Sequence, residues 1–206
     1  MIKTLPKTVT FAEFVQWKPD GGFYELHDGA IVEMSQPTGS HETIKGFLAR
    51  KLTVEFDRLN LPYFIPNQAL VKPPESDSAY LPDVLILNPA NLVNEPLWKN
   101  ASTVTQGASI PLVVEVVSTN WRDDYLVKVA DYEIIGIPEY WIVDYAALGG
   151  RRFIGNPKEA TISIYQLLEG EYQISQFKGD ERILSPTFPE LNLTAEQIFR
   201  AGNISE

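Results

Sequence analysis

Near the beginning of the chain, apolar residues first recur at the spacing of a helix and then follow the pattern of short strands. Thr10 precedes the apolar residues of 11–15, and Glu13 stands three positions after it, a combination that predicts a capped helix start. Two short apolar runs, 23–26 and 30–34, then flank an Asp-Gly pair. Because Asp-Gly favours tight turns between strands, these runs predict a β-hairpin.

The clearest periodic segment is a helix predicted from 40 to 60. Its apolar residues recur at helical intervals, and the Leu-Pro pair that follows predicts its end, because proline cannot continue a helix. Farther along, apolar runs between turn residues predict strands, whereas the polar connection 88–110 predicts no definite element. The predicted strands cover 63–71, 80–87, 112–117, 139–144, 151–154, 161–167 and 171–177.

A second amphipathic helix is predicted over 123–135, with Gly136 as its stop. It lies between two apolar strands, and this order is typical of a parallel βαβ unit. A terminal helix is predicted to begin near Thr194. The fold class is therefore α/β, with an α+β mixed sheet, two principal helices and a β-rich C-terminal extension. The positions expected to face inward on the second helix are Leu126, Val129, Ala130 and Ile134.

Length and composition are those of an ordinary folded protein. With 206 residues, 44% hydrophobic and 21% charged, the chain is expected to form a single domain over 1–206. It contains no cysteine, which excludes disulfides and zinc–thiolate sites. No stretch reaches the roughly 20 apolar residues of a membrane span, and the N-terminus has no apolar segment of signal-peptide length. We therefore expect a cytoplasmic protein without a membrane partner.

Two acidic residues interrupt segments that otherwise predict buried strands. Asp83 stands near the start of one strand, and Glu115 lies at the centre of a Val-Val-Glu-Val-Val run. Strand alternation places Glu115 with Val117 on one face of the sheet and Val114 on the other. If the two strands are neighbours, the carboxylates of Asp83 and Glu115 converge at one end of the sheet. A buried carboxylate is costly unless a positive partner meets it.

Mg²⁺ or Mn²⁺ would be a suitable partner, because these hard cations prefer carboxylate oxygen. Such a cation polarises a phosphoryl oxygen and lowers the pKa of a bound water, which favours phosphodiester hydrolysis. Lys128, on the second predicted helix, would orient the water or stabilise the charge of the transition state. Asp83, Glu115 and Lys128 together make a nuclease the leading hypothesis.

Each of these residues also has a purely structural interpretation. Asp83 follows a proline, where an aspartate often accepts backbone hydrogen bonds. Glu115 could pair in a structural salt bridge, and Lys128 lies four residues after Asp124, the spacing of an ordinary ion pair on a helix surface. Glu25 is expected on a solvated face of the hairpin, although it could approach the metal cleft.

The overall charge weighs against tight, nonspecific binding of nucleic acid. The chain has 17 basic and 27 acidic residues, a formal net charge of −10. Most nucleic-acid binders need a cationic surface that replaces the counterions of the phosphates. A local basic groove, or the charge of a bound metal, would reconcile the acidic whole with a nucleic-acid substrate.

The candidate residues form part of an ordered series that resembles the Uma-type restriction endonuclease family, within the PD-(D/E)XK nuclease superfamily. The resemblance runs from residue 24 to residue 191, and the series in this order is specific, whereas a Pro-Asp pair alone is not. The segments that carry it are Asp-Gly-Ala-Ile-Val-Glu-Met-Ser at 28–35, His-Glu at 41–42, Pro-Asp-Val at 82–84, Val-Glu-Val-Val-Ser at 114–118, Asp124 with Lys128, and Gly-Ile-Pro-Glu-Tyr-Trp-Ile-Val-Asp at 136–144.

The resemblance implies a restriction-endonuclease-like core that cleaves DNA with Mg²⁺ or Mn²⁺. In the superfamily a lysine usually lies two residues after the glutamate, a place that Val117 holds here. The family resemblance implies that Lys128, on the following helix, replaces that lysine. A helix glutamate often joins the metal shell, and Glu42 matches it. The implied metal ligands are thus Asp83, Glu115 and Glu42, and the implied catalytic residues are these three with Lys128.

Two alternatives to a nuclease stay open at this point. A non-catalytic module could keep the fold and hold nucleic acid in its cleft. An interaction protein could pair its carboxylates internally and present its acidic surface to a basic partner. A homodimer is expected in the nuclease case, because cutting both strands of a duplex benefits from two sites.

Overall fold

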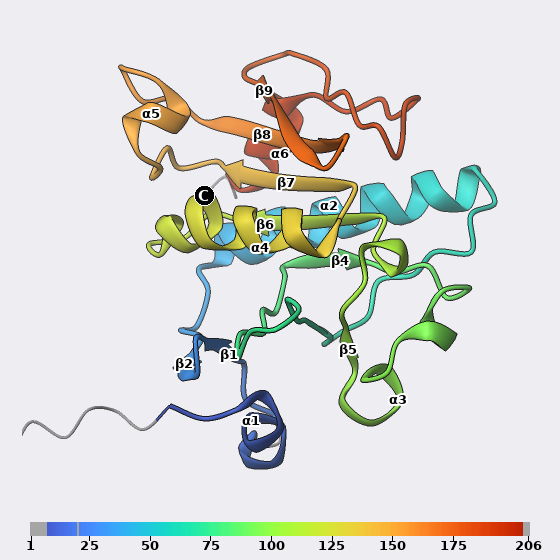
Figure 1. The fold of residues 1–206 in the computed structure, drawn as a ribbon. Helices are drawn as coiled ribbons and strands as arrows, with labels where there is room; N and C mark the ends of the chain where they lie inside the picture. The colour runs from blue at the N-terminus through green and yellow to red at the C-terminus, as the bar shows by residue number, and fades with distance from the viewer. Residues whose placement is uncertain (1–7, 20, 204–206) are drawn as a thin grey trace, which may run out of the picture.

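The computed structural model describes residues 8–19 and 21–203, and a five-stranded sheet in the order β4-β6-β7-β8-β9 forms its centre (Figure 1). β6 and β7 are parallel and joined by helix, as a parallel pair requires, and the other neighbours are antiparallel. The predicted mixed α/β class is confirmed. The strands are β4 (Val84–Ile86), β6 (Leu112–Val116), β7 (Glu139–Asp144), β8 (Thr161–Leu168) and β9 (Glu171–Phe177).

Helices cover both faces of this sheet. α2 and α6 share a hydrophobic core with the face that carries Val114 and Trp141. The segment η3–α4 packs on the opposite face, which carries Val113 and Tyr140. Tyr140 and Trp141 are fully buried core aromatics. No helix within the described residues is long and apolar enough to cross a membrane. The helices are α2 (Gly39–Arg58), η3 (Asp123–Val127), α4 (Lys128–Ile135) and α6 (Ala195–Ala201).

A small N-terminal layer forms from a helix and a hairpin, as the sequence predicts. The Thr10 side chain accepts from the backbone N–H of Glu13, and the Glu13 carboxylate accepts from the Thr10 N–H, so the capping box is confirmed. The antiparallel hairpin joins the rest of the molecule where Leu26 exchanges two backbone hydrogen bonds with Ala79. This layer comprises α1 (Phe11–Trp17), β1 (Tyr24–His27) and β2 (Ala30–Glu33).

Between α2 and β6 the chain contains only short elements. The strand predicted over 63–71 is reduced to β3, and Phe64 forms an isolated bridge with Leu87. Pro66, in the middle of the predicted strand, accounts for the interruption, because proline has no N–H for a strand ladder. The connection 88–110, for which the sequence predicted no element, contains η1 (Leu92–Asn94), α3 (Trp98–Ala101), β5 (Thr103–Val104) and η2 (Gly107–Ser109). β5 pairs in parallel with β3 (Leu70–Val71).

Residues 151–154 were expected to form a strand and form a helical turn instead, α5 (Arg151–Ile154). Gly155, at φ 92°, ends the turn in a backbone conformation that favours glycine. Only Ile154 is buried, while both arginines are exposed. A run with one buried residue shows neither a helical nor a strand period, so its pattern could not distinguish the two.

The prediction of which residues in 123–135 face the core is also wrong. The backbone N–H of Lys128 bonds to the carbonyl of Asp123, five residues back, so the segment begins with a π-helical turn. This wider turn changes which side chains within it and after it face the core, and Leu126 and Ile134 are 41% and 65% exposed. Of the four positions expected inward, only Val129 packs against the core, partly buried. Gly136 ends the helix at φ 81°, as predicted. The buried residues are Asp124, Tyr125, Lys128, Tyr132 and Ile135.

Candidate active site

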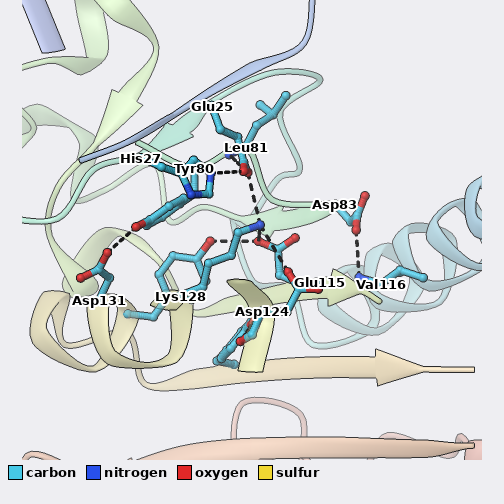
Figure 2. A network of polar contacts seen from close by, with 12 residues as sticks. Glu25, His27, Tyr80, Leu81, Asp83, Glu115, Val116, Asp124, Lys128 and Asp131 are labelled. Carbon is cyan, nitrogen blue, oxygen red and sulfur yellow. Dashed lines mark hydrogen bonds and ion pairs between the residues drawn. The ribbon is translucent and has the colours of Figure 1, made fainter. Parts of the chain in front are cut away.

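Asp83 and Glu115 come together at one end of the sheet. Val84 pairs with Val114 in the antiparallel register of β4 and β6, and this register, continued by one residue, places Asp83, which directly precedes β4, opposite Glu115. The Asp83 Oδ2 atom accepts a hydrogen bond of 2.8 Å from the Val116 N–H (Figure 2). Asp83 thus accepts a backbone hydrogen bond, as the purely structural interpretation expects. It also lies beside Glu115, as the nuclease hypothesis requires.

His41, in the first turn of α2, contacts Asp83 and the backbone of Val116. Its Nε2 atom lies 3.0 Å from the Val116 carbonyl oxygen and 3.3 Å from Asp83 Oδ2. Its Nδ1 atom is buried without a hydrogen bond. Burial lowers the pKa of His41, but the hydrogen bond and charge of Asp83, with smaller contributions from the Val116 carbonyl and Glu42, raise it above its ordinary value.

Lys128 reaches Glu115 inside the protein. The ammonium donates to Glu115 Oε1 at 3.0 Å, and the Tyr132 hydroxyl donates to the same oxygen at 3.0 Å. The Glu115 and Lys128 side chains are each 4% exposed, so this is a buried pair rather than a surface ion pair. The π-helical turn makes the contact possible, because it turns Lys128 toward the sheet.

Two further carboxylates surround the same ammonium. Lys128 Nζ lies 3.2 Å from Glu25 Oε1 and 3.5 Å from Asp124 Oδ1. Figure 2 shows Lys128 reaching between Glu25 and Glu115. The Glu25 carboxylate also accepts from the Leu81 N–H at 2.9 Å, so it ties the hairpin to the site. The expectation that Glu25 decorates a solvated face is wrong, because the segment before β4 covers it.

Burial and the single ammonium of Lys128 together set the pKa values of the carboxyl groups around it. Burial raises the pKa of Glu115 well above its ordinary value, although Lys128 lowers it. Burial likewise raises the pKa of Asp124 to about 6. Burial would raise the pKa of Glu25 too, but Lys128, His27 and the Leu81 N–H bring it down to about 2. Burial alone would lower the pKa of Lys128. The surrounding carboxylates outweigh this effect and raise the pKa well above its ordinary value.

Glu42 and Lys45 lie at the solvent side of the site. With Asp83 they line a groove of about 230 Å³ between α2 and the segment before β4. Lys45 Nζ lies 3.7 Å from Asp83 Oδ1 and 3.9 Å from Glu42 Oε1. Glu42 Oε1 is 3.6 Å from His41 Nδ1. Asp83 is therefore the carboxylate that connects the open groove to the buried group around Lys128.

The donor set fits a hard divalent cation by chemistry and by charge. Asp83, Glu115 and Glu42 offer only carboxylate oxygens, and three buried carboxylates, those of Glu25, Glu115 and Asp124, share the single ammonium of Lys128. Within the part of the chain that the structure describes, no three His, Cys, Asp or Glu residues are already grouped around one point. Lys128 holds the position between Glu25, Glu115 and Asp124. The roles of Asp83, Glu115, Glu42 and Lys128 therefore stay predictions.

The fold is that of a mixed α/β protein, and comparison with known proteins gives the family of the chain. The chain belongs to the family described as "Putative restriction endonuclease" (Uma2), whose model matches residues 11–196. A crystal structure of "a putative nuclease belonging to DUF820 from Anabaena variabilis ATCC 29413" is similar, with a TM-score of 0.69 and 16% identity over 94% of this chain and 99% of that chain. At this identity the likeness shows the fold alone. None of the curated proteins compared with the chain matches it.

Proposed function

We propose that this protein is an endonuclease that hydrolyses the phosphodiester bonds of DNA with Mg²⁺ or Mn²⁺. The observation that carries the proposal is the position of Asp83, directly before β4, opposite Glu115 of the neighbouring β6, with Lys128 at 3.0 Å from Glu115. Membership of the restriction endonuclease family supports the same reaction class. A homodimer, which would present one site to each strand of a duplex, is part of the proposal.

In this proposal Asp83 and Glu115 would hold the cation, and Glu42 would assist from the groove. When bound, the cation would polarise a phosphoryl oxygen and make a water more acidic. Lys128, which is buried, fixes the Glu115 carboxylate through its contact at 3.0 Å and places a permanent positive charge next to this carboxylate. His41 is a positioning residue, because it contacts Asp83 and the Val116 carbonyl and so sets the direction of the carboxylate.

The rival proposal is a non-catalytic module on the same fold, in which the carboxylates serve only to pair with Lys128. The four contacts of that ammonium to Glu25, Glu115, Asp124 and the Tyr80 ring are those of a buried structural network. The two proposals differ in one measurable respect, because only the nuclease turns over a phosphodiester. A protein-interaction module would neither cleave DNA nor bind it.

The direct test is cleavage of a labelled DNA duplex with Mg²⁺ or Mn²⁺ by the wild type, Asp83→Asn and Asp57→Asn. Asn keeps the size of Asp but lacks the charge for a metal, so Asp83→Asn should lower the cleavage rate by about a hundredfold or more. Asp57, exposed on α2, is the matched control and should cleave like the wild type. Full metal-dependent cleavage by Asp83→Asn, or none by the wild type, would refute the proposal.

A further inference from the structure

Exposed arginines gather at the same end of the sheet as the candidate active site. Arg122 directly precedes η3, and Arg151 and Arg152 begin α5, which follows β7. β6 and β7 are parallel, so the segments that follow them leave the sheet at the same end. Asp83, Glu115 and the start of α2 also lie at this end of the sheet, and Figure 1 shows α5 and the start of η3 there. We call Arg122, Arg151 and Arg152 the arginine ledge.

Aromatic rings hold two of these side chains in place. The Arg122 guanidinium carbon lies 4.4 Å from the centre of the Trp121 ring, and that of Arg152 lies 4.5 Å from the centre of the Phe153 ring. The two rings are themselves in contact, with centroids 6.1 Å apart. Both guanidiniums therefore rest on one aromatic pair, which restricts their motion and leaves their N–H groups for another partner.

The aromatic pair connects the ledge to the candidate active site. The Tyr125 ring stacks on Phe153 at 4.6 Å and meets Trp121 edge-on at 6.3 Å. Tyr125 is buried in η3, next to Asp124, whose carboxylate contacts Lys128 at 3.5 Å. A ligand on the ledge would thus lie beside the π-helical turn that presents Lys128.

None of the three arginines pairs with a carboxylate of residues 8–19 or 21–203. This is notable because the chain carries 27 acidic residues, and Arg58 and Arg200 both form ion pairs. Arginine offers five N–H donors in a planar fork that matches phosphate oxygens in two-point contacts. Exposed guanidiniums held on rings and lacking acidic partners have the chemistry of a phosphate-binding surface.

We propose that the arginine ledge binds the phosphate backbone of the DNA strand that runs past the candidate active site. The inference deepens the proposed function and rests on it for the class of substrate. The three arginines neither touch the reacting atoms nor hold the metal, so their role is binding. A local cationic surface beside the site also explains how a chain with a net charge of −10 could hold a polyanion.

The test is fluorescence anisotropy of a labelled 20-base-pair duplex, with Ca²⁺ as the oxygen-seeking cation, over a series of salt concentrations. The variant Arg122→Ala, Arg151→Ala, Arg152→Ala should bind at least about tenfold more weakly at 50 mM salt. Its slope of log affinity against log salt should be smaller by about two to three, roughly one for each lost phosphate contact. Replacing all three by lysine keeps the charge but not the fork, and should retain most of the slope while losing affinity.

Lys99→Ala is the matched control, because Lys99 is an exposed cation on α3. It should bind like the wild type, and thermal melting of each variant checks that it folds. The proposal is overturned if the triple alanine variant binds within twofold of the wild type, if Lys99→Ala weakens binding equally, or if the wild type binds no DNA.

Measuring both binding and cleavage tests the arginine ledge and the proposed nuclease activity separately. Loss of binding in the ledge variant, together with a wild type that never cleaves, would support the ledge and refute the nuclease. Cleavage by the wild type, together with unchanged binding in the ledge variant, would refute the ledge and leave the nuclease in place.

Discussion

At the scale of single residues, Lys128 organises the site because three carboxylates from different parts of the chain meet its ammonium. Asp124 precedes it by one helical turn, Glu115 belongs to β6, and Glu25 comes from the N-terminal hairpin. Removing one partner of a buried ion pair leaves an uncompensated charge, which typically costs about 3–5 kcal/mol. The network therefore couples the stability of the fold to the geometry around Glu115.

We predict that Glu25→Gln destabilises the protein by about 3 kcal/mol at neutral pH, because Lys128 loses a buried anionic partner. The pKa of Glu25 is about 2 in the folded protein against an ordinary value near 4.5. A lowered folded pKa stabilises the protein above pH 4.5, and this stabilisation disappears as the pH falls toward 2. Urea unfolding of the wild type and the variant at pH 7 and pH 3 measures the difference.

The matched control for this prediction is Glu33→Gln, on the exposed side of the same hairpin. It should change the free energy of unfolding by less than about 0.5 kcal/mol at either pH. A Glu25→Gln penalty as small as that of the control, or one that is the same at both pH values, would contradict the described contact with Lys128.

At the scale of elements, hydrophobic pattern and turn chemistry predict most of the sheet and both principal helices. Pattern also places Glu115 on the face opposite Val114, as the two cores confirm. Pattern fails where the backbone departs from a regular period, as in the π-helical turn that rotates α4. It also fails for Glu25, whose burial comes from the pairing of Leu26 with Ala79, more than fifty residues away.

We predict that the two neighbouring isoleucines of α4 differ in their contribution to stability. Ile135 is 8% exposed and Ile134 is 65% exposed. Ile135→Ala should cost about 2–4 kcal/mol, because it leaves a cavity in the core. Ile134→Ala should cost less than about 0.5 kcal/mol, because its side chain is mostly in water. Thermal or urea unfolding of both variants decides the matter, and the reverse order would show that the helix faces the other way.

At the scale of the whole molecule, the acidic surface and the cationic surroundings of the site are separate features. The net charge of −10 belongs to the entire chain, whereas Lys45 and the arginine ledge lie at the site end of the sheet. The sequence allowed a local basic groove but could not locate it, because Arg122 and Arg152 are far apart in the sequence and the rings on which they rest, Trp121 and Phe153, come into contact only through the tertiary fold. Family membership and fold agree with a nuclease, and metal and DNA are the proposed parts of the account.

The measurement that tests the central claim most directly is a calorimetric titration of Mn²⁺ into the wild type, Asp83→Asn and Glu115→Gln, with a short duplex present. Asp57→Asn serves as the control for nonspecific binding to an acidic surface. The account predicts saturable binding in the wild type and the control, and binding at least about tenfold weaker in both site variants, because one cation needs both carboxylates. Equal binding in all four proteins, or none in the wild type, would contradict the shared metal site.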